Sequence, residues 1–290
     1  MESDFSINAY ANLSVTVVGL GLIGGSFAMA LRDLGFKNLW GIDINEATVL
    51  EAENMGIIDK GYTEAKYPLE KSDIVIISLY PEQTVEFVKE NIDNFKPGAI
   101  ITDTAGIKED IVKKLSSFLP NNVDFIGGHP MAGREGSGLG QASKDIFYGA
   151  SYIFTPTENN KDINIKVLEC IAYLLGCKNV VKMDPKDHDE VIAYTSHLPH
   201  ILAVSLINSD IFNEDTSLFA AGAFKDATRV ADINESLWVE LINSNRENVI
   251  KNIEIFESKI QEIKHAIAKN DTDLLKHEFK KASLRRREIV

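Results

Sequence analysis

Cysteine is scarce in this sequence. The 290 residues include only Cys170 and Cys177, seven positions apart and without histidine neighbours. This spacing matches no metal or redox motif, so we expect two reduced thiols that face the core and no bound metal. A chain of this length buries a large core without disulfides. It is about twice as long as a usual single domain, which predicts two domains.

Long apolar runs and an excess of positive charge are also missing. No run reaches the roughly eighteen apolar residues of a membrane-spanning helix. The opening residues MESDFSINAY have neither the basic nor the apolar region of a signal peptide, so we expect a cytoplasmic protein. The formal net charge is −13, and such a field repels phosphate backbones. We therefore expect no nucleic-acid or membrane partner, and a local basic pocket for any anionic substrate.

Short apolar runs alternate with amphipathic segments in the first part of the chain. The predicted strands are residues 15–18, 39–42, 74–79, 99–101, 123–126, 152–154 and 180–183. Because helix-like stretches lie between most of them, the rhythm predicts βαβ units and a parallel sheet covered on both faces.

The pattern changes at Asp184, where Asp184-Pro185 reads as a helix N-cap followed by a first-turn proline. No convincing strand follows. One face of a long helix is predicted by Ile250, Ile253, Ile260, Ile263 and Ile267, at spacings of three, four and seven. We predict an all-helical second domain over residues 184–290. Its apolar stripes are generous for its size, which predicts a homodimer formed through this domain.

A glycine motif follows the first predicted strand. Residues 17–26 contain GxGxxG, in which Gly19 permits a tight turn, Gly21 admits a pyrophosphate and Gly24 allows helix and strand to pack closely. Such glycines also occur in plain turns, but the strand before and the helix after favour a Rossmann-type dinucleotide-binding domain over residues 1–183.

Asp43 closes the second strand, nineteen residues after Gly24. A carboxylate there accepts both ribose hydroxyls and repels a 2′-phosphate, which predicts NAD as the cofactor. The remaining predicted cofactor-binding residues are Leu20, Leu22 and Ile23 in the loop, Ser78, Leu79, Tyr80 and Pro81 after the third strand, and Asp103 and Thr104 after the fourth.

Residues 127–138 read GGHPMAGREGSG and place His129 just past a predicted strand. The carboxyl ends of such strands border the cofactor crevice, so we expect the ring there. The glycines would let the backbone turn sharply and leave room for a substrate. A neutral imidazole can accept a proton from an alcohol whose carbon gives a hydride to NAD⁺. A structural histidine that caps a turn fits these residue types equally well.

This stretch resembles the GxHPxAGxExSG signature of the prephenate and arogenate dehydrogenase family. Residues 19–24 resemble the nucleotide loop of that family, residues 195–200 its SHLPH motif, and residues 222–229, GAFKDATR, its GFxDxTR segment. Trp238 follows at the familiar distance, and the resemblance runs through most of the chain. It implies NAD-dependent conversion of prephenate to 4-hydroxyphenylpyruvate, CO₂ and NADH, a step of tyrosine biosynthesis.

The resemblance also implies roles for individual residues. His129 would accept the proton of the ring hydroxyl, and Arg229 would bind a substrate carboxylate, as a guanidinium does well. His197 and His200 would lie near the substrate, with His200 in direct contact, and Pro199 would kink their helix. Lys225, Arg134, Glu135, Ser137 and Trp238 complete the predicted substrate-binding set.

The sequence departs from the family at two places. The loop after the fourth strand commonly reads DxGSxK, with a serine that hydrogen-bonds the catalytic histidine, and Gly106 stands at that position here. We hypothesise that Thr104 or a water molecule orients His129 instead. Arg134 stands where many members have a small polar residue. It would pair with Glu135 at the surface, or reach cofactor or substrate.

Other substrates, other reductase families and a non-enzymatic function are alternatives to prephenate dehydrogenation. Arogenate carries an ammonium group that Glu135 or Asp226 could bind, although we favour prephenate. Other two-domain hydroxyacid or imine reductases place a lysine on the inter-domain helix, and residues 191–208 contain none. A dinucleotide-sensing regulator would need Asp43 but not His129 and Arg229. We expect a dehydrogenase without an appended chorismate mutase or regulatory domain, and inhibition by tyrosine remains open.

Overall fold

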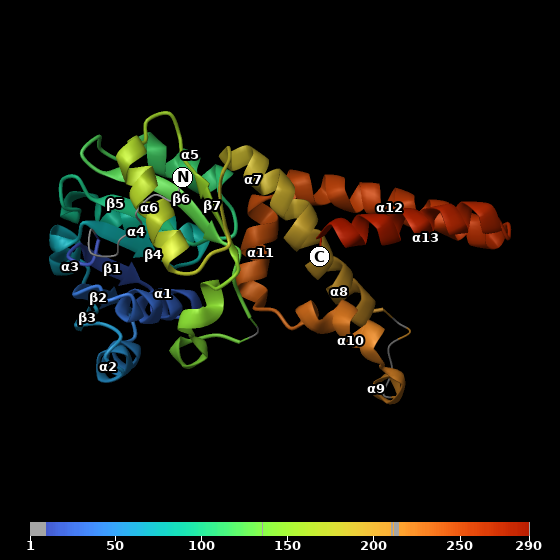
Figure 1. The fold of residues 1–290 in the computed structure, drawn as a ribbon, viewed down its shortest axis with the longest axis horizontal. Coiled ribbons are helices and arrows are strands. Elements are labelled where there is room, and N and C mark those ends of the chain that lie inside the picture. Colours follow the sequence, from blue (N-terminus) through green and yellow to red (C-terminus); the bar gives the residue numbers. More distant parts are fainter. Residues whose placement is uncertain (1–9, 135, 210, 212–214, 290) are drawn as a thin grey trace.

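The computed structural model describes residues 10–134, 136–209, 211 and 215–289. An α/β domain comes first, and a helical domain lies beside it (Figure 1). Helices α12 (Arg246–Ala268) and α13 (Thr272–Ile289) form a hairpin that extends away from the sheet. The predicted combination of a Rossmann-type domain with an all-helical domain is confirmed.

The sheet has eight strands in the order β3-β2-β1-β4-β5-β6-β7-β8. Their bounds are β1 (Ser14–Val18), β2 (Asn38–Ile42), β3 (Lys60–Tyr62), β4 (Ile74–Ile77), β5 (Ile100–Asp103), β6 (Asp124–Pro130), β7 (Ser151–Thr155) and β8 (Asn179–Lys182). Strand β3 was not predicted, because its three residues KGY form no apolar run.

The prediction of a wholly parallel sheet was wrong at one edge. Strand β7 runs antiparallel to β6, and β8 is parallel to β7. A parallel connection requires a crossover over one face of the sheet, usually by a helix. Between β6 and β7 the described residues form 3₁₀ turns (Leu139–Gln141 and Lys144–Phe147) and no longer helix, and the chain returns at the same edge.

Successive strand residues face opposite cores. Val17 packs in a cluster with Phe27 of α1 (Leu22–Asp33) and Leu168 of α6 (Asp162–Leu174). Val18 packs in a second cluster, with Leu115 of α5 among its members. That second face is covered by α3 (Lys66–Lys71), α4 (Pro81–Glu90) and α5 (Glu109–Phe118), while α2 (Glu46–Asn54) lies beside β3. Apolar burial on both faces is the main source of stability of such a sheet.

The helical domain begins at α7 (Pro185–Ile192), which a π-helical segment (Ala193–His197) joins to α8 (Leu198–Ile207). Then come α9 (Thr216–Phe219), α10 (Gly222–Thr228), a 3₁₀ turn (Arg229–Ala231), α11 (Glu235–Ser244), α12 and α13. No strand occurs among the described residues beyond β8, as predicted. The predicted isoleucine stripe lies on α12, where Ile250, Ile260 and Ile267 are 44%, 45% and 59% exposed.

Residues Pro185–Ile207 form a continuous helix whose most apolar window of eighteen residues has a mean hydropathy of 1.2, which is long and apolar enough, by length and composition alone, to cross a membrane. The sequence analysis predicted no membrane-spanning helix, because no unbroken apolar run in the chain is long enough. In this fold α8 packs against α10 and α12, and the helix buries two histidines, His188 and His197. Of the most apolar window of this helix, 28% is buried within the chain.

The helical domain meets the carboxyl edge of the sheet through α7 and α11. Leu241 of α11 belongs to the second apolar cluster of the sheet domain. Asp189 of α7 accepts hydrogen bonds from the backbone N–H groups of Lys108 and Glu109, at 2.8 and 2.9 Å. Glu240 of α11 accepts one from Glu82 N. Two carboxylates of one domain thus sit at helix N-termini of the other, where negative charge is favourable.

Candidate active site

The glycine loop has the geometry that dinucleotide binding requires. Gly19 has a φ of +82°, which favours glycine, and a Cβ on Gly24 would lie 1.8 Å from the Gly19 carbonyl oxygen. Gly21 is the N-cap of α1, and a Cβ there would meet nothing within 4 Å. Loop and helix N-terminus therefore leave an open approach to free N–H groups, which fits a pyrophosphate.

Asp43 follows β2 and contacts this loop directly. Its Oδ2 accepts a hydrogen bond from Leu20 N and its Oδ1 one from Asn45 N, both at 2.9 Å. Each oxygen accepts one bond in these contacts, so further acceptor capacity remains for ribose hydroxyls. Leu22 and Ile23 lie half-buried in the first turn of α1. The residues present fit NAD.

The ends of β4 and β5 lie beside each other at the same edge. Tyr80 is the N-cap of α4 and Pro81 its first residue, while Ser78 and Leu79 are half-buried just before them. The Thr104 hydroxyl donates to Ser78 Oγ at 3.3 Å. That hydroxyl is therefore engaged away from His129, and the hypothesis that it orients the ring gains no support.

Asp103 differs from its predicted role as a cofactor contact. Its side chain is fully buried and forms an ion pair with Lys108, which is equally buried. The carboxylate also accepts from Gly128 N at 3.0 Å and Ala105 N at 3.1 Å. These bonds satisfy the acceptors that burial would otherwise leave unpaired. Asp103 thus organises the loop and strand β6.

The prediction that His129 lies just past the end of a strand was wrong, because β6 includes His129 and ends at Pro130. Pairing of β6 with β5 stops at Ile126, but β6 continues through Pro130 beside β7, with His129 opposite Ile153. The antiparallel strand β7 supplies this extra ladder. It carries the histidine beyond the carboxyl end of β5, so the ring still reaches the crevice edge.

The glycines before His129 serve close packing and not a sharp turn. A Cβ on Gly127 would lie 2.4 Å from Thr155 Oγ1. One on Gly128 would lie 2.7 Å from the Asp103 carbonyl oxygen. Positive φ angles, which do mark turns, occur later in the stretch, at Gly136 (+103°) and Gly138 (+81°).

His129 contacts a histidine that the sequence analysis had not singled out. His129 Nδ1 lies 2.9 Å from His188 Nε2, and His188 Nδ1 lies 2.6 Å from Asp189 Oδ1. The two rings are 5.1 Å apart between centroids, at an interplanar angle of 65°. On its other side, a Cβ on Gly106 would lie 3.8 Å from His129 Nε2.

Burial and neighbouring groups keep His129 neutral. Burial holds its pKa well below the ordinary value, and the His188, Lys108 and His197 side chains lower that pKa further. Burial also lowers the pKa of His188, against the opposing effect of Asp189. A neutral imidazole is the form that accepts a proton.

A second group of predicted residues gathers on the helical domain. The His200 ring lies 3.8 Å from that of Trp238 between centroids, and the His197 ring lies 5.9 Å from Trp238. His200 Nδ1–H donates to the Ser196 carbonyl at 2.8 Å, which leaves Nε2 as an acceptor. Burial lowers the pKa of His200, and the positive charge of Arg229 lowers it further. Arg229 therefore lies near His200.

Pro199, which was predicted to kink this helix, lies where a π-helical segment joins α8. It stands in the first turn of α8, directly after the π-helical segment, in which Leu198 N bonds the Ala193 carbonyl. A wide π turn accommodates the missing N–H of proline, and such turns are frequent at functional sites. It places His197 and His200 beside Trp238.

The other predicted substrate contacts are peripheral or undescribed. Ser137 and Lys225 are exposed, and the exposed Arg134 donates to the Gln141 carbonyl. Glu135 lies outside the described residues. None of the three described residues, Arg134, Ser137 and Lys225, hydrogen-bonds to His129, whose Nδ1 bonds to His188.

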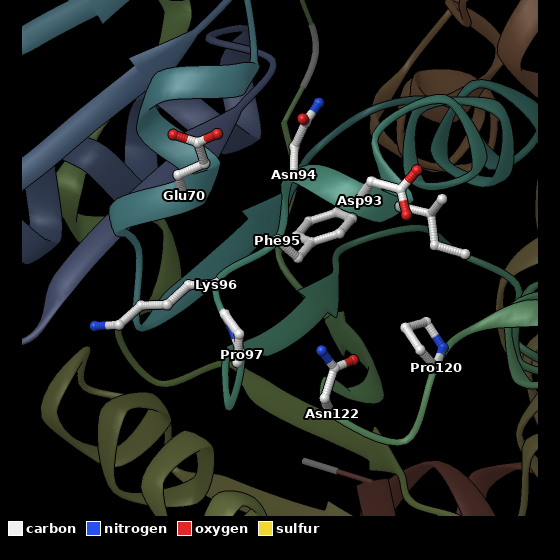
Figure 2. Close-up of a pocket in the computed structure, with 9 residues that line it drawn as sticks. Glu70, Asp93, Asn94, Phe95, Lys96, Pro97, Pro120 and Asn122 are labelled. Atoms are coloured by element: carbon white, nitrogen blue, oxygen red, sulfur yellow. The ribbon is translucent and has the colours of Figure 1, made fainter.

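A separate cavity lies at the opposite edge of the sheet. Figure 2 shows its lining, which includes Glu70, Phe95, Lys96 and Asn122, and its volume is about 340 Å³. These residues precede the amino ends of β4, β5 and β6. Since ligands of such sheets bind at the carboxyl edge, this cavity is not the active site.

Four buried polar residues near His129 escaped the sequence analysis: Lys108, His188, Asp189 and Asn245. Asn245 donates to the Asp189 carbonyl at 2.7 Å and lies 3.5 Å from His197 Nδ1. The available signals were Lys108 at the end of the quoted DxGSxK-like loop and the sequence Asp187-His188-Asp189, which stands shortly before the SHLPH-like motif. Among the described residues, no group of three or more His, Cys, Asp or Glu side chains could hold a metal.

Comparison with protein-family models gives two matches. Residues 27–183 match the nucleotide-binding domain of prephenate dehydrogenase, and residues 184–281 match its dimerization domain. Together these matches cover most of the chain.

Individual relatives agree with these matches. The chain is 31% identical to the prephenate dehydrogenase of Bacillus subtilis over 93% of this chain and 74% of that protein. It resembles the crystal structure of prephenate dehydrogenase from A. aeolicus in complex with hydroxyphenyl propionate and NAD⁺, with a TM-score of 0.88, 33% identity, and coverage of 96% of this chain and 98% of that one. The Synechocystis arogenate dehydrogenase structure gives a TM-score of 0.82 at 27% identity, covering 96% of this chain and 100% of that one.

Proposed function

The chain belongs to the prephenate dehydrogenase family, and we propose that it catalyses the NAD-dependent oxidative decarboxylation of prephenate to 4-hydroxyphenylpyruvate, a step of tyrosine biosynthesis. The observation that carries the proposal is the position of His129. A histidine held neutral stands at the carboxyl edge of the sheet, in the domain that carries the glycine loop, and contacts His188 of the helical domain.

His129 acts as the base in this proposal. Its Nε2 accepts the proton of the substrate hydroxyl as the carbon that bears it loses a hydride. Bound NAD⁺ supplies the hydride acceptor. The ring carboxylate leaves as CO₂, and its bonding electrons make the ring aromatic. The new phenolate then takes the proton back from His129, so that prephenate and NAD⁺ yield the keto acid, CO₂ and NADH with no net proton release.

The helical domain binds the rest of the substrate. Arg229 pairs with a carboxylate of the prephenate dianion, and the His200 Nε2 and the Trp238 ring border the same space. Holding both ends of the substrate fixes its reacting carbon relative to the cofactor, which is the main task in a reaction driven by aromatisation.

Cofactor choice rests on Asp43. The carboxylate follows β2 and already accepts from the glycine loop at Leu20 N. It would accept the ribose hydroxyls of NAD and repel the 2′-phosphate of NADP. The A. aeolicus relative is a complex with NAD⁺, which supports this choice.

Arogenate is the second candidate substrate, because the chain also resembles an arogenate dehydrogenase structure throughout its length. Arogenate has an amino acid side chain in place of the keto acid. A bound ammonium group needs an acceptor, which Asp226 on α10 could provide.

Assembly and location form a further part of the proposal. The match of residues 184–281 to a dimerization domain supports a homodimer, and so do the half-exposed isoleucines of α12. Exposed apolar surface of this kind is typical of an interface. We propose that the dimer works in the cytoplasm.

Initial rates of NADH formation test the proposal, with prephenate and arogenate as substrates and NAD⁺ and NADP⁺ as cofactors. We expect prephenate with NAD⁺ to give the highest kcat/KM. A preference for arogenate would replace the substrate but keep the role of His129. No NADH with either substrate would leave a dinucleotide-binding regulator as the better reading.

A further inference from the structure

The ring of His129 has one hydrogen-bonding partner on its Nδ1 side, His188 Nε2 at 2.9 Å. On its Nε2 side stands Gly106, which has no side chain to offer, although a Cβ there would be within 3.8 Å. The orientation of the ring therefore depends on His188. Thr104, the other candidate, bonds Ser78.

The hydrogen bonds beyond His188 decide which nitrogens carry protons. Asp189 receives three donors: the N–H groups of Lys108 and Glu109 and the Nδ1 of His188. A carboxylate accepts only, so His188 Nδ1 carries a proton. In neutral His188 the Nε2 is then an acceptor, and His129 Nδ1 must donate to it. His129 Nε2 then carries no proton, and its lone pair is available to accept one.

We propose that His188 and Asp189 are positioning residues that hold His129 in the tautomer with an unprotonated Nε2, and that docking of the helical domain on α5 assembles this hold. The proposal deepens the proposed function, on which it rests for the role of His129 as base. The order Asp189, His188, His129 follows the logic of a carboxylate that fixes an imidazole tautomer through a hydrogen bond.

The Asp189 carboxylate both bonds to His188 and joins the helical domain to the start of α5. Its Oδ1 accepts from both His188 and Lys108 N, and its Oδ2 accepts from Glu109 N at the start of α5. His129 belongs to the sheet domain, whereas His188 and Asp189 belong to the helical domain. If the two domains separated, the sheet domain would keep His129 but lose the partner of its Nδ1.

The groups around His129 favour a mechanism in which no proton passes from His129 to His188 or Asp189. Among the described residues, the titratable groups that act on the His129 ring are His188 from α7, Lys108 before α5, and His197 from the π-helical segment, and all three oppose its protonation. During the reaction His129 Nε2 takes and returns one proton. Its Nδ1 proton stays in the bond to His188, and Asp189 remains a carboxylate.

Nitrogen NMR of the six histidine side chains tests the tautomer without any ligand or activity. Comparison with His129→Asn assigns the His129 signals. We expect His129 in the wild-type protein to be protonated at Nδ1 and bare at Nε2, and His188→Leu to shift it towards a mixture. A wild-type His129 protonated at Nε2, or an unchanged tautomer in His188→Leu, would overturn the proposal.

Kinetics with prephenate and NAD⁺ provide the second test. For His188→Leu we expect kcat to fall about 10- to 100-fold with KM values within about twofold, because positioning acts on the proton transfer. His188→Gln should lose less, since its amide oxygen can accept from His129 Nδ1. Asp189→Asn should resemble His188→Leu, because an amide has only one oxygen for three donors.

Glu240→Ala is the matched control. Glu240 also binds a helix N-terminus across the domain interface, at Glu82 N, but makes no hydrogen bond to the histidines. We expect this variant to keep the wild-type His129 tautomer and most of kcat. Equal kcat losses in Glu240→Ala and Asp189→Asn would mean that docking alone matters, against a positioning role.

The failure of this inference differs from the failure of the proposed function. A wild-type protein inactive on prephenate and arogenate would remove the function while the NMR result still decides the tautomer. If His188→Leu does not fold, the wild-type spectrum and His188→Gln carry the test. An active wild type with equally active His188 variants would leave the function intact and reject the positioning residues.

Discussion

Asp43 Oδ2 lies 2.9 Å from Leu20 N, so the carboxylate predicted to bind the ribose also holds the glycine loop. For Asp43→Asn we expect the KM for NAD⁺ to rise about tenfold, because a charge-assisted bond is lost, and the preference for NAD⁺ over NADP⁺ to shrink. Ratios of kcat/KM for the two cofactors measure both effects. Asp33→Asn, which removes an exposed carboxylate paired with Lys144, should leave the ratio unchanged.

Replacement by alanine should affect two glycines of the loop differently. A Cβ on Gly24 would lie 1.8 Å from backbone, so Gly24→Ala should distort the loop, lower the melting temperature and abolish NADH binding. Gly21→Ala meets no protein atom within 4 Å and should keep its melting temperature while binding NADH more weakly. NADH fluorescence titration and thermal unfolding separate the two. Normal NADH affinity in Gly24→Ala would contradict the loop geometry.

The pH dependence of kcat/KM should reflect a histidine that resists protonation. Burial, His188, Lys108 and His197 hold the pKa of His129 well below its usual value. A base with a lowered pKa stays neutral to lower pH. The decline of kcat/KM on the acid side should therefore have its midpoint below pH 6.5, the ordinary pKa of histidine. Rates of NADH formation from pH 4 to 8 measure it. An acid limb above pH 6.5 would contradict this environment.

Stability should decline in the same acid range. Burial lowers the pKa values of four histidines, His129, His188, His197 and His200, and lowers that of His197 to about 4. The unfolded chain then binds more protons, so unfolding becomes easier as pH falls below 6.5. His197 alone accounts for about 3 kcal/mol by pH 4. Urea unfolding should be less pH-dependent in His197→Asn, and an equal dependence would refute the assignment.

Arg229 and Arg134 offer a paired test of substrate binding. Arg229 lies close enough to His200 to lower its pKa, whereas Arg134 is exposed and bonds the Gln141 carbonyl. We expect Arg229→Ala to raise the KM for prephenate about 10- to 100-fold through loss of a bidentate carboxylate pair. Arg134→Ala should change this KM less than about twofold. Steady-state kinetics decide, and reversed effects would exchange the two roles.

Local sequence patterns were sufficient for much of this fold. Alternating apolar runs predicted seven of the eight strands, and GxGxxG predicted the turn at Gly19. The isoleucine spacing predicted α12. Each of these features depends on residues close together in the chain, so periodicity and turn chemistry reveal them. Strand β3 escaped because it is short and polar.

The direction of β7 and the surroundings of His129 came only from the tertiary structure. The extra ladder with β7 keeps His129 inside a strand, and Gly127 and Gly128 are needed because other chain segments approach them closely. Those segments lie far from the glycines in sequence, so no local pattern could indicate packing as the reason.

Residue type and local spacing were enough to predict two domains, a glycine-rich loop after the first strand and a histidine near the sheet edge, because each of these features depends on residues close together in the chain. The contacts of the His129 side chain, in contrast, depend on the tertiary structure. His188 lies fifty-nine positions away on another domain, and Asp189 reaches the start of α5 from the same helix. Hydrogen bonds between distant segments depend on how the domains dock, which local residue order does not encode.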